Sequence, residues 1–329
     1  DGSYPKLSGE VSLELENDWT HHSDDDGSEL NDLYPTLDVA ATLAFTPEFS
    51  ANLEATLESI EDTEDDRAFD DLGAYIGVLT VNYDTDDFSV YAGKFGANFG
   101  IAWDVTPGLG WGNLSDDYEI AEVLGFGGGV NFNLAGQHTV SGSVFFADTT
   151  FLSDSVGDSR GPLDESDGGP ANTESLESFA LALDGGFDAA EGFRYHIGFS
   201  SLAEGDDGDK NQLGYAIGAE YEIALNEDFT LTPVAEIAYL DNAGGVSGDD
   251  TLYSTIGATL GYGSWSFTSS YQRRDIDSGG TDTNDYFADA TVGYEFDFGL
   301  FVAAGYRFAE EDGVDSRVLG VLANYTFEF

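Results

Sequence analysis

The sequence predicts an all-β protein, a single domain over residues 1–329 that forms a sixteen-stranded antiparallel transmembrane β-barrel. Three observations predict this fold. Apolar and polar residues alternate over sixteen segments, the connections between the segments are short and long in turn, and no apolar run reaches the ~20 residues of a membrane-spanning helix. A closed barrel is the other structure that can cross a bilayer, because all its backbone groups pair between strands.

Alternation with period two is the signature of a strand with one apolar and one polar face. Between Leu213 and Leu225 every second residue is apolar, whereas Glu220 and Glu222 lie on the opposite face. The expected strands are 7–17, 34–46, 49–60, 73–84, 87–95, 120–134, 137–148, 176–187, 192–202, 211–225, 228–240, 251–262, 265–275, 285–297, 300–309 and 316–329.

The connections predict the orientation of the barrel. Seven are short: 46–48, 85–87, 135–137, 188–192, 226–228, 263–264 and 297–299. Eight are long: 18–32, 61–71, about 95–118, 148–174, 203–211, 241–250, 275–284 and 310–316. Short periplasmic turns and long external loops are typical of bacterial outer-membrane barrels, so both termini are expected on the turn side.

Aromatic residues gather beside the short turns on the apolar faces, which favours an interfacial girdle. The alternative is the general preference of Phe and Tyr for strands. The residues are Phe45, Phe49, Tyr83, Phe88, Phe132, Phe187, Phe193, Phe229, Tyr262, Trp265 and Phe296.

The last segment, VLGVLANYTFEF, carries Tyr325, Phe327 and Phe329 on one face. It resembles the C-terminal signature of bacterial outer-membrane proteins, which implies that the assembly machinery of that membrane reads it.

The charge is strongly acidic: 64 Asp and Glu against 10 Lys and Arg, a net charge of −54. Nucleic-acid binding is excluded, since it requires a basic surface. Because 41% of the residues are hydrophobic, the chain is expected to fold despite its charge. The sequence has no Cys and no Met, so we expect no disulfide, no thiolate metal site, and a mature chain whose start has been removed.

Acidic residues lie on the strand faces opposite the apolar ones, and bases there are too few to pair with them. Buried charges must be paired, so these faces are expected to line a water-filled lumen. The acids are Glu10, Glu14, Asp38, Glu54, Glu58, Asp184, Glu220, Glu222, Glu236, Asp289 and Glu295. The bases are Lys94, Arg194, Arg274 and Arg307.

The third long connection reads GKFGANFGIAWDVTPGLGWGNLSDD over 93–117, with glycines for bends and aromatic residues for packing on a wall. Two arrangements fit this composition, a loop folded into the barrel and a cap outside it. In the inward arrangement, acids of the loop face the aperture and Lys94 opposes them. These acids are Asp104, Asp116, Asp117 and Glu119.

The position of this loop resembles the general porins, whose third loop folds inward and narrows the barrel. The run GKFGANFGIAWDVTPG, followed by DDYEIAEVLGFG, resembles the porin-like proteins of alphaproteobacteria. The resemblance implies an outer-membrane homotrimer with a constriction at about 95–118. The chain departs from the best-known porins because it has no basic cluster on strands two to four, which puts a strong transverse field in doubt.

Carboxylates in a narrow channel attract cations and repel anions. The expected function is therefore a cation-preferring pore for passive diffusion of small hydrophilic solutes, without catalysis. Two other readings stay open: a substrate-selective channel, and a surface barrel that adheres or binds lipid without conducting. An outer-membrane lipase is a further alternative, although the four histidines form no local Ser-His-acid pattern. His21 and His22 are expected in an external loop.

Acidic external loops present oxygen ligands of the kind that Ca²⁺ prefers. No cofactor is expected to be required, and the alternative is a solvated acidic surface. Bound divalent ions would also bridge the loops to lipopolysaccharide. The candidate ligands are Asp24, Asp25, Asp26, Asp206, Asp207 and Asp209. Small apolar residues on the first strands, Ala41, Ala51, Ala55 and Gly77, suit a seam between subunits, or merely relieve crowding.

Overall fold

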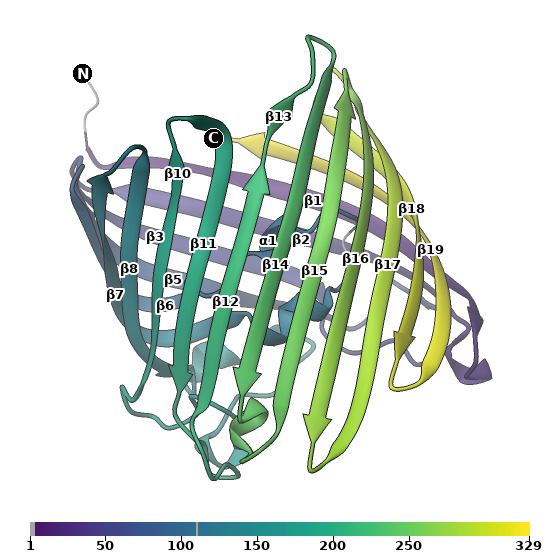
Figure 1. The fold of residues 1–329 in the computed structure, drawn as a ribbon, viewed down its shortest axis with the longest axis horizontal. Coiled ribbons are helices and arrows are strands. Elements are labelled where there is room, and N and C mark those ends of the chain that lie inside the picture. Colours follow the sequence, from purple (N-terminus) through teal and green to yellow (C-terminus); the bar gives the residue numbers. More distant parts are fainter. Residues whose placement is uncertain (1–3, 110) are drawn as a thin grey trace.

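The computed structural model describes residues 4–109 and 111–329 as one antiparallel sheet that closes on itself (Figure 1). Sixteen strands form the wall, as predicted. They are β1 (Lys6–Ser23), β2 (Asn31–Ala44), β3 (Phe49–Ser59), β5 (Leu72–Asp84), β6 (Phe88–Ala97), β7 (Ile120–Asn133), β8 (Gln137–Ala147), β10 (Ser178–Phe187), β11 (Ala190–Leu202), β12 (Gln212–Tyr221), β14 (Phe229–Asp241), β15 (Asp250–Tyr262), β16 (Trp265–Ser278), β17 (Thr281–Glu295), β18 (Leu300–Glu311) and β19 (Val314–Glu328).

Three two-residue strands complete the sheet. β13 (Ile223–Ala224) continues the line of β12 toward the turn, β4 (Arg67–Ala68) pairs in parallel with β2, and β9 (Val156–Gly157) pairs with β5. The helical turns are short: α1 (Ala102–Val105) and the 3₁₀ turns 26–28, 114–118, 151–153, 165–167 and 243–245. No helix among the described residues is long and apolar enough to cross a membrane.

The barrel closes where the last strand pairs with the first. Leu13 lies opposite Tyr325, and Val11 lies opposite Phe327. The backbones of Gly9 and Phe329 exchange two hydrogen bonds of 3.1 and 2.9 Å. The start of β1 and the end of β19 therefore lie on the side of the short turns, as expected (Figure 1).

The apolar faces of the strands point outward, away from the lumen. In β12, Tyr215 and Ile217 are 46% and 59% exposed, whereas Ala216 between them is buried. Aromatic rings stand at the turn ends of the strands, and Phe229 stacks on Tyr262 with 4.5 Å between centroids. A closed barrel with an apolar, aromatic-edged outer band is the architecture of bacterial outer-membrane proteins, and the chain lies in that membrane.

Three connections expected to be long are shorter, because the strands continue into them. β1 runs to Ser23, so His21 and His22 lie on a strand and not in a loop. β16 and β17 meet at a turn over Gly279–Gly280, and β18 and β19 meet at Asp312–Gly313, all four with positive φ. Beyond the apolar band both strand faces are polar, so the alternation ends although the pairing does not.

The structure places the main apolar core inside the barrel rather than between layers. Phe99, Leu114 and Tyr118 come from the loop that follows β6, and each is at most 3% exposed. They pack against inward-facing residues of the wall, including Phe145. The core thus consists of a loop held against the inner wall, and this packing creates the candidate site.

Candidate functional site: a constriction inside the barrel

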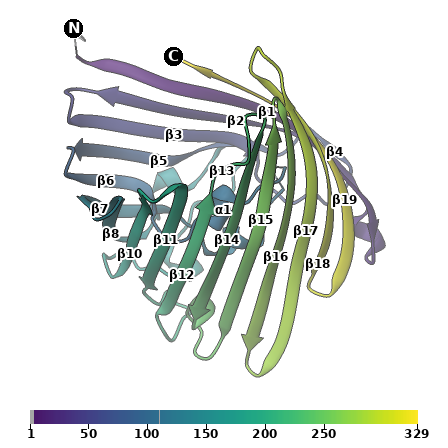
Figure 2. The same ribbon diagram turned by 45° about the horizontal axis from the view of Figure 1, so that its top comes forward.

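The described residues of 98–119, which we call the inner loop, leave the wall after β6 and return to it at β7. Figure 2 shows α1, which belongs to this loop, enclosed by the strands of the barrel. The loop contacts β8, β10, β11, β14, β16, β18 and β1 through hydrogen bonds. The predicted inward fold of the third long connection is therefore confirmed, and the external cap is not observed.

Glu236 on β14 holds the middle of the inner loop. Its carboxylate accepts hydrogen bonds from the backbone N–H groups of Ile101 at 2.8 Å and Ala102 at 2.9 Å, and from the hydroxyl of Tyr118 at 2.6 Å. Glu236 is only 2% exposed. One buried carboxylate thus satisfies three donors, including the free N–H groups at the start of α1.

His196 on β11 holds the beginning of the inner loop. Its Nε2 accepts a hydrogen bond from the backbone N–H of Gly100 at 2.9 Å, and its Nδ1 lies 2.7 Å from the carboxylate of Asp184. Since Nε2 is an acceptor, the proton of the neutral ring sits on Nδ1 and is donated to Asp184. Asn98 donates to the other oxygen of the same carboxylate, so a wall histidine and its acid fix two residues of the loop.

The far end of the inner loop contacts β1 and β18, near the place where β19 pairs with β1 and closes the barrel. Trp111 donates from Nε1 to the carboxylate of Asp18 on β1 at 2.6 Å. Arg307 on β18 donates to the carbonyl oxygen of Gly112 at 2.8 Å while it forms a two-pronged pair with Asp289. Arg307 is therefore a support of the loop and not a free charge in the lumen.

Glycines on the inner wall make room for the apolar side chains of the loop. A Cβ placed on Gly214 would lie 2.6 Å from the ring of Phe99, and one on Gly320 would lie 2.5 Å from the ring of Trp111. A Cβ placed on Gly257 would lie 2.9 Å from Pro107. Real Cβ contacts are not this short, so the wall accepts the loop only where these positions lack side chains.

The four predicted aperture acids are all exposed on the inner loop. Asp116 is close enough to interact electrostatically with both Asp117 and Glu119. Asp117 differs from the others because it accepts hydrogen bonds from Arg274 at 2.7 Å and Tyr253 at 3.1 Å. Arg274 in turn pairs with Asp285 at 2.7 Å. Asp104, Asp116 and Glu119, in contrast, form no ion pair with a base of the described chain.

Two of these acids have altered proton affinity. Both touch water yet lie in a narrow lumen among many protein atoms. Burial raises the pKa of the Asp116 carboxyl, and the charge of Asp117 adds to this, although the N–H of Asn113 acts in the opposite direction. Burial also raises the pKa of Glu119, with the charges of Asp116 and Asp104 contributing.

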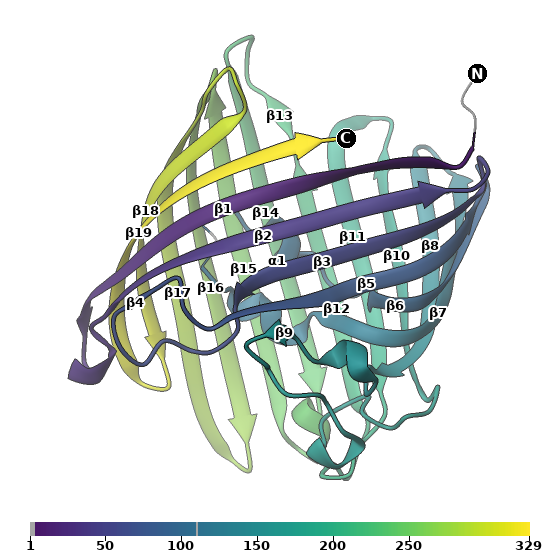
Figure 3. The same ribbon diagram turned by 180° about the vertical axis from the view of Figure 1, so that it is seen from behind.

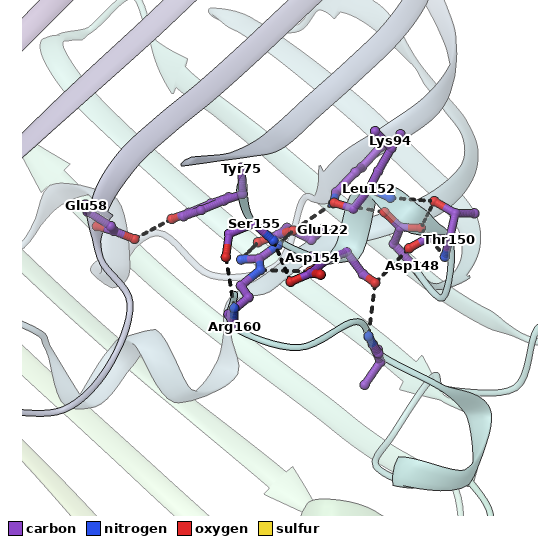
Figure 4. A network of polar contacts seen from close by, with 12 residues as sticks. Glu58, Tyr75, Lys94, Glu122, Asp148, Thr150, Leu152, Asp154, Ser155 and Arg160 are labelled. Carbon is purple, nitrogen blue, oxygen red and sulfur yellow. Dashed lines mark hydrogen bonds and ion pairs between the residues drawn. The ribbon is translucent and has the colours of Figure 1, made fainter. Parts of the chain in front are cut away.

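Lys94 is not the opposing base of the aperture, and this prediction is wrong. Its side chain is 0% exposed, and the alternation of β6 places it on the same outward face as Val90. The ammonium group lies 2.7 Å from Glu122 and 2.9 Å from Asp148, and it donates to the carbonyl of Leu152 (Figure 4). The cover comes from the loop over residues 148–177, which sequence spacing does not reveal.

The Lys94 cluster lies where the strand that pairs with β5 changes from β6 to β9. β6 pairs with β5 only as far as Lys94, opposite Leu79, and near the start of β5 Gly73 and Ala74 pair with β9 instead. Figure 3 shows β9 beside β5 at the loop end of the barrel. Arg160, from the loop that contains β9, pairs with Glu122 and lies 4.1 Å from the ring centre of Tyr75 on β5. The external loop thus closes the gap that β6 leaves when it turns inward.

The predicted wall acids Glu14, Asp38 and Glu54 lie on β1, β2 and β3. Glu14 accepts from Asn324 at 3.3 Å, Asp38 accepts from Thr56 at 2.7 Å, and none of the three forms an ion pair with a described base. In contrast to them, the wall bases Arg274 and Arg307 are engaged by acids. These three wall acids are therefore without an ion-pair partner in the described chain, whereas the two wall bases are paired.

Two cavities adjoin the inner loop. One of about 740 Å³ lies on the turn side and is lined by Asp104, Arg194 and Glu220. Another of about 480 Å³ lies at the far end of the loop and is lined by Asp18, Glu58 and Trp111, among others. Free space thus remains on both sides of the loop.

The candidate calcium ligands are exposed and partly occupied by local contacts. Asp25 accepts from the N–H of Gly27, Asp207 from that of Gly169, and Asp209 from that of Ser247. Asp24 and Asp206 are also exposed, while the side chain of Asp26 lies outside the described part. Across residues 4–109 and 111–329 no group of three or more acidic or histidine side chains is placed to hold a metal, so Ca²⁺ binding stays a prediction.

The aromatic residues of the C-terminal strand point outward. Tyr325, Phe327 and Phe329 are 41%, 50% and 51% exposed, on the face that β19 presents to the membrane. Their role as an assembly signal stays a prediction.

Solved structures of bacterial outer-membrane channels share this fold. DcaP of Acinetobacter baumannii superposes with a TM-score of 0.61 at 15% identity, covering 98% of this chain and 96% of that one. OccAB3 of the same organism gives 0.59 at 11% identity, covering 98% and 100%. OpdK of Pseudomonas aeruginosa gives 0.57 at 11% identity, covering 98% and 99%. Neither a protein-family model nor a curated protein matches the sequence.

Sequence reasoning found the loop and its acids but missed how the loop is held. Glu236 was expected only as one of many lumen acids, and His196 carried no specific signal. The glycines of the inner wall offered one signal, because they interrupt polar faces that carry charged residues elsewhere. Only the three-dimensional path of the loop shows which side chain each glycine meets.

Proposed function

We propose that the protein is an outer-membrane porin that conducts small hydrophilic solutes and ions by passive diffusion, with a preference for cations. The observation that carries the proposal is the inner loop inside the lumen, with Asp104, Asp116 and Glu119 exposed and without an ion-pair partner. No chemical step is involved, and no cofactor is required.

The arrangement of the bases supports the cation preference. Arg274 and Arg307 are engaged by Asp117, Asp285 and Asp289. Arg194 is paired with Glu220, and Lys94 is buried away from the lumen. The net field at the constriction is therefore negative. Negative fields in a narrow channel with low-dielectric walls concentrate cations and exclude anions.

A substrate-selective channel is the second candidate function, and a specific observation favours it. The turn-side cavity brings the exposed Arg194 together with Asp104 and Glu220, so acidic and basic groups line one space. One solved neighbour, OpdK, is described with bound vanillate. A surface barrel that does not conduct is the third candidate, and it predicts no current at all.

The proposal includes partners as well as solutes. The barrel contacts outer-membrane lipid and lipopolysaccharide, with Ca²⁺ bound at the acidic external loops as a bridge. It assembles as a homotrimer through the small outward residues near Ala41 and Ala51. The run GKFGANFGIAWDVTPG supports a relation to alphaproteobacterial porins.

A reversal-potential measurement in a planar bilayer tests the function. In a salt gradient the wild-type protein is expected to show a cation-selective potential and an ohmic current. Replacing Asp104→Asn, Asp116→Asn and Glu119→Gln together is expected to move that potential toward zero, because the unpaired charges of the loop are gone.

The matched control replaces Asp24→Asn, Asp25→Asn and Asp206→Asn, which removes the same charge from external loops. An unchanged potential in the loop variant would contradict the assignment of the filter. Saturation or block by one solute would favour the selective channel, and absence of current would favour the non-conducting barrel.

A further inference from the structure

We propose that His196 is a proton-binding site that controls the start of the inner loop. The neutral ring holds the loop against β11, and a second proton on the ring releases it. The channel thereby responds to acid through its wall as well as through the carboxyls at its aperture. The inference goes beyond the proposed conduction of cations, because it concerns the position of the loop and not the solute that passes.

The contacts of His196 require an unprotonated Nε2. This atom lies 2.9 Å from the backbone nitrogen of Gly100, whose N–H group can only donate. Nδ1 lies 2.7 Å from the carboxylate of Asp184, which can only accept while it is ionised. The ring is fully buried, so both contacts are made within the protein. The loop is therefore attached at Gly100 only while the ring carries one proton, on Nδ1.

A second proton on the ring changes the contact with Gly100 and leaves the other contact intact. The free position is Nε2, and two N–H groups then face each other where one hydrogen bond had formed. That bond is lost and the two donors repel each other, while Nδ1–H continues to donate to Asp184. His196 and Asp184 both line the turn-side cavity, so a proton reaches them from the lumen.

Mostly acidic groups surround the ring. In the strand pairing, one row crosses β10, β11, β12 and β14 and consists of Asp184, His196, Gly218 and Glu236. Further charged or titratable groups face this row from β11, β12 and the inner loop: Arg194, Glu220, Asp104 and Tyr118. Because acids predominate, a charged ring has counter-charges on several sides and stays in the wall when the loop leaves.

Release of Gly100 affects the start of the inner loop and not its other attachments. The neighbouring Phe99 lies over wall glycines, and a Cβ on Gly198 would lie 3.1 Å from its ring. Glu236 still accepts from Ile101, and Trp111 still donates to Asp18. Residues 99 and 100 are therefore expected to move from β11 toward the lumen, which narrows the passage and lowers the single-channel conductance.

Hydrogen exchange measures the release without depending on conduction. The full-length protein is reconstituted in lipid vesicles, and exchange of the backbone amides of residues 98–102 is followed from about pH 8 to about pH 5, where histidine changes its charge. The rates are corrected for the intrinsic pH dependence of exchange. We expect these amides to exchange roughly three- to ten-fold faster at the acidic end, the factor for loss of one hydrogen bond.

His196→Gln removes the proton-binding site and keeps an acceptor. The side-chain oxygen of glutamine reaches the place of Nε2 and takes up no proton in this pH range, so the acid-dependent acceleration and the fall in conductance are both expected to disappear. His22→Gln is the matched control, since His22 lies on β1 with Glu29 at 3.8 Å, and it should retain both effects. All three proteins are also measured with Asp116→Asn and Glu119→Gln, which removes the titration of these two aperture acids from the conductance.

Nitrogen NMR of the wild-type protein labelled at histidine reports the charge of the ring directly, so the test does not rest on one variant. Proton uptake by His196 and release of Gly100 are expected to share one midpoint. The proposal would be overturned by exchange that stays unchanged in acid, by equal acceleration in His196→Gln, or by a ring that becomes charged while Gly100 stays protected. A cation-selective reversal potential that persists alongside any of these results would leave the proposed channel function standing.

Discussion

Single wall residues hold the inner loop, and each does so by meeting several donors or acceptors at once. The carboxylate of Glu236 accepts three hydrogen bonds, and the ring of His196 connects Gly100 to Asp184. These residues lie on rigid strands, so they fix the position of a segment that has almost no regular structure of its own. The width of the aperture is therefore decided by the wall as much as by the loop.

Glu236→Gln is expected to loosen the inner loop. An amide has one acceptor oxygen in place of two, so at least one backbone N–H at the start of α1 loses its partner in a buried place. The cost is about 1–3 kcal/mol of local stability. Hydrogen exchange of residues 98–106 measures it, with faster exchange expected. Glu222→Gln, which removes an acid that contacts nothing in the loop, should leave exchange unchanged, and equal effects of both variants would contradict the anchor.

The cation preference is expected to weaken on mild acidification. The raised pKa values of Asp116 and Glu119 mean that these carboxyls take up protons at a higher pH than ordinary surface acids, which titrate near 4. As pH falls, they are the first of the aperture acids to become neutral, and the channel loses negative charge. Reversal potentials measured from neutral to acidic pH should show this early step.

The doubly neutral variant, Asp116→Asn with Glu119→Gln, should lack the early step while retaining the change at lower pH. A wild-type profile that begins to change only where ordinary carboxyls titrate would show that these two groups do not set the selectivity.

At the scale of elements, the strands were predictable and the loop contacts were not. Strand periodicity is local, since alternation from Leu213 to Leu225 requires only the sequence itself. The burial of Lys94 is not local, because the residues that cover it lie more than fifty positions later. Lys94 was expected on the lumen face, whereas the strand pairing places it on the outward face opposite Leu79, beneath a covering loop.

The inner-wall glycines that contact the inner loop are expected to be sensitive to added side-chain volume. Gly320→Val on β19 would push against the ring of Trp111, because even a Cβ would lie 2.5 Å from it. Overpacking of this kind costs about 1–3 kcal/mol, and the far end of the loop should move into the lumen. Single-channel conductance is expected to fall or to flicker. Gly77→Ala, where a Cβ meets nothing within 4 Å, is the control. Equal conductance of the two variants would contradict the proposed contact between Gly320 and Trp111.

At the scale of the whole molecule, the first and last strands complete the barrel. β19 pairs with β1 along thirteen residue pairs, so the wall is incomplete until the C-terminus is in place. The sequence predicted the strand number and the side of the termini, because connection lengths carry that information. It could not predict the extensions of β1, β16 and β18 beyond the membrane, where both faces are wet and alternation disappears.

Deletion of Phe329 is expected to reduce the amount of assembled barrel in the outer membrane. The change removes an exposed aromatic ring and the two backbone hydrogen bonds to Gly9. Cell fractionation with a heat-modifiability assay measures assembly. Phe298, exposed in a short turn, supplies the control, since Phe298→Ala removes a ring at a site away from the terminus. Normal levels of the truncated chain would remove the argument for a terminal signal.

One part of β5 pairs with β6 and another part pairs with β9, and this change of partner has a consequence for engineering. Because the chain turns inward after β6 to form the constriction, part of β5 loses its neighbour in the wall. The loop that contains β9 covers this gap. The inner loop and the covering loop therefore depend on each other, although residues 120–147 separate them in the sequence. A graft that transfers the filter to another barrel should carry residues 148–160 with it, or the recipient will leak sideways into the bilayer.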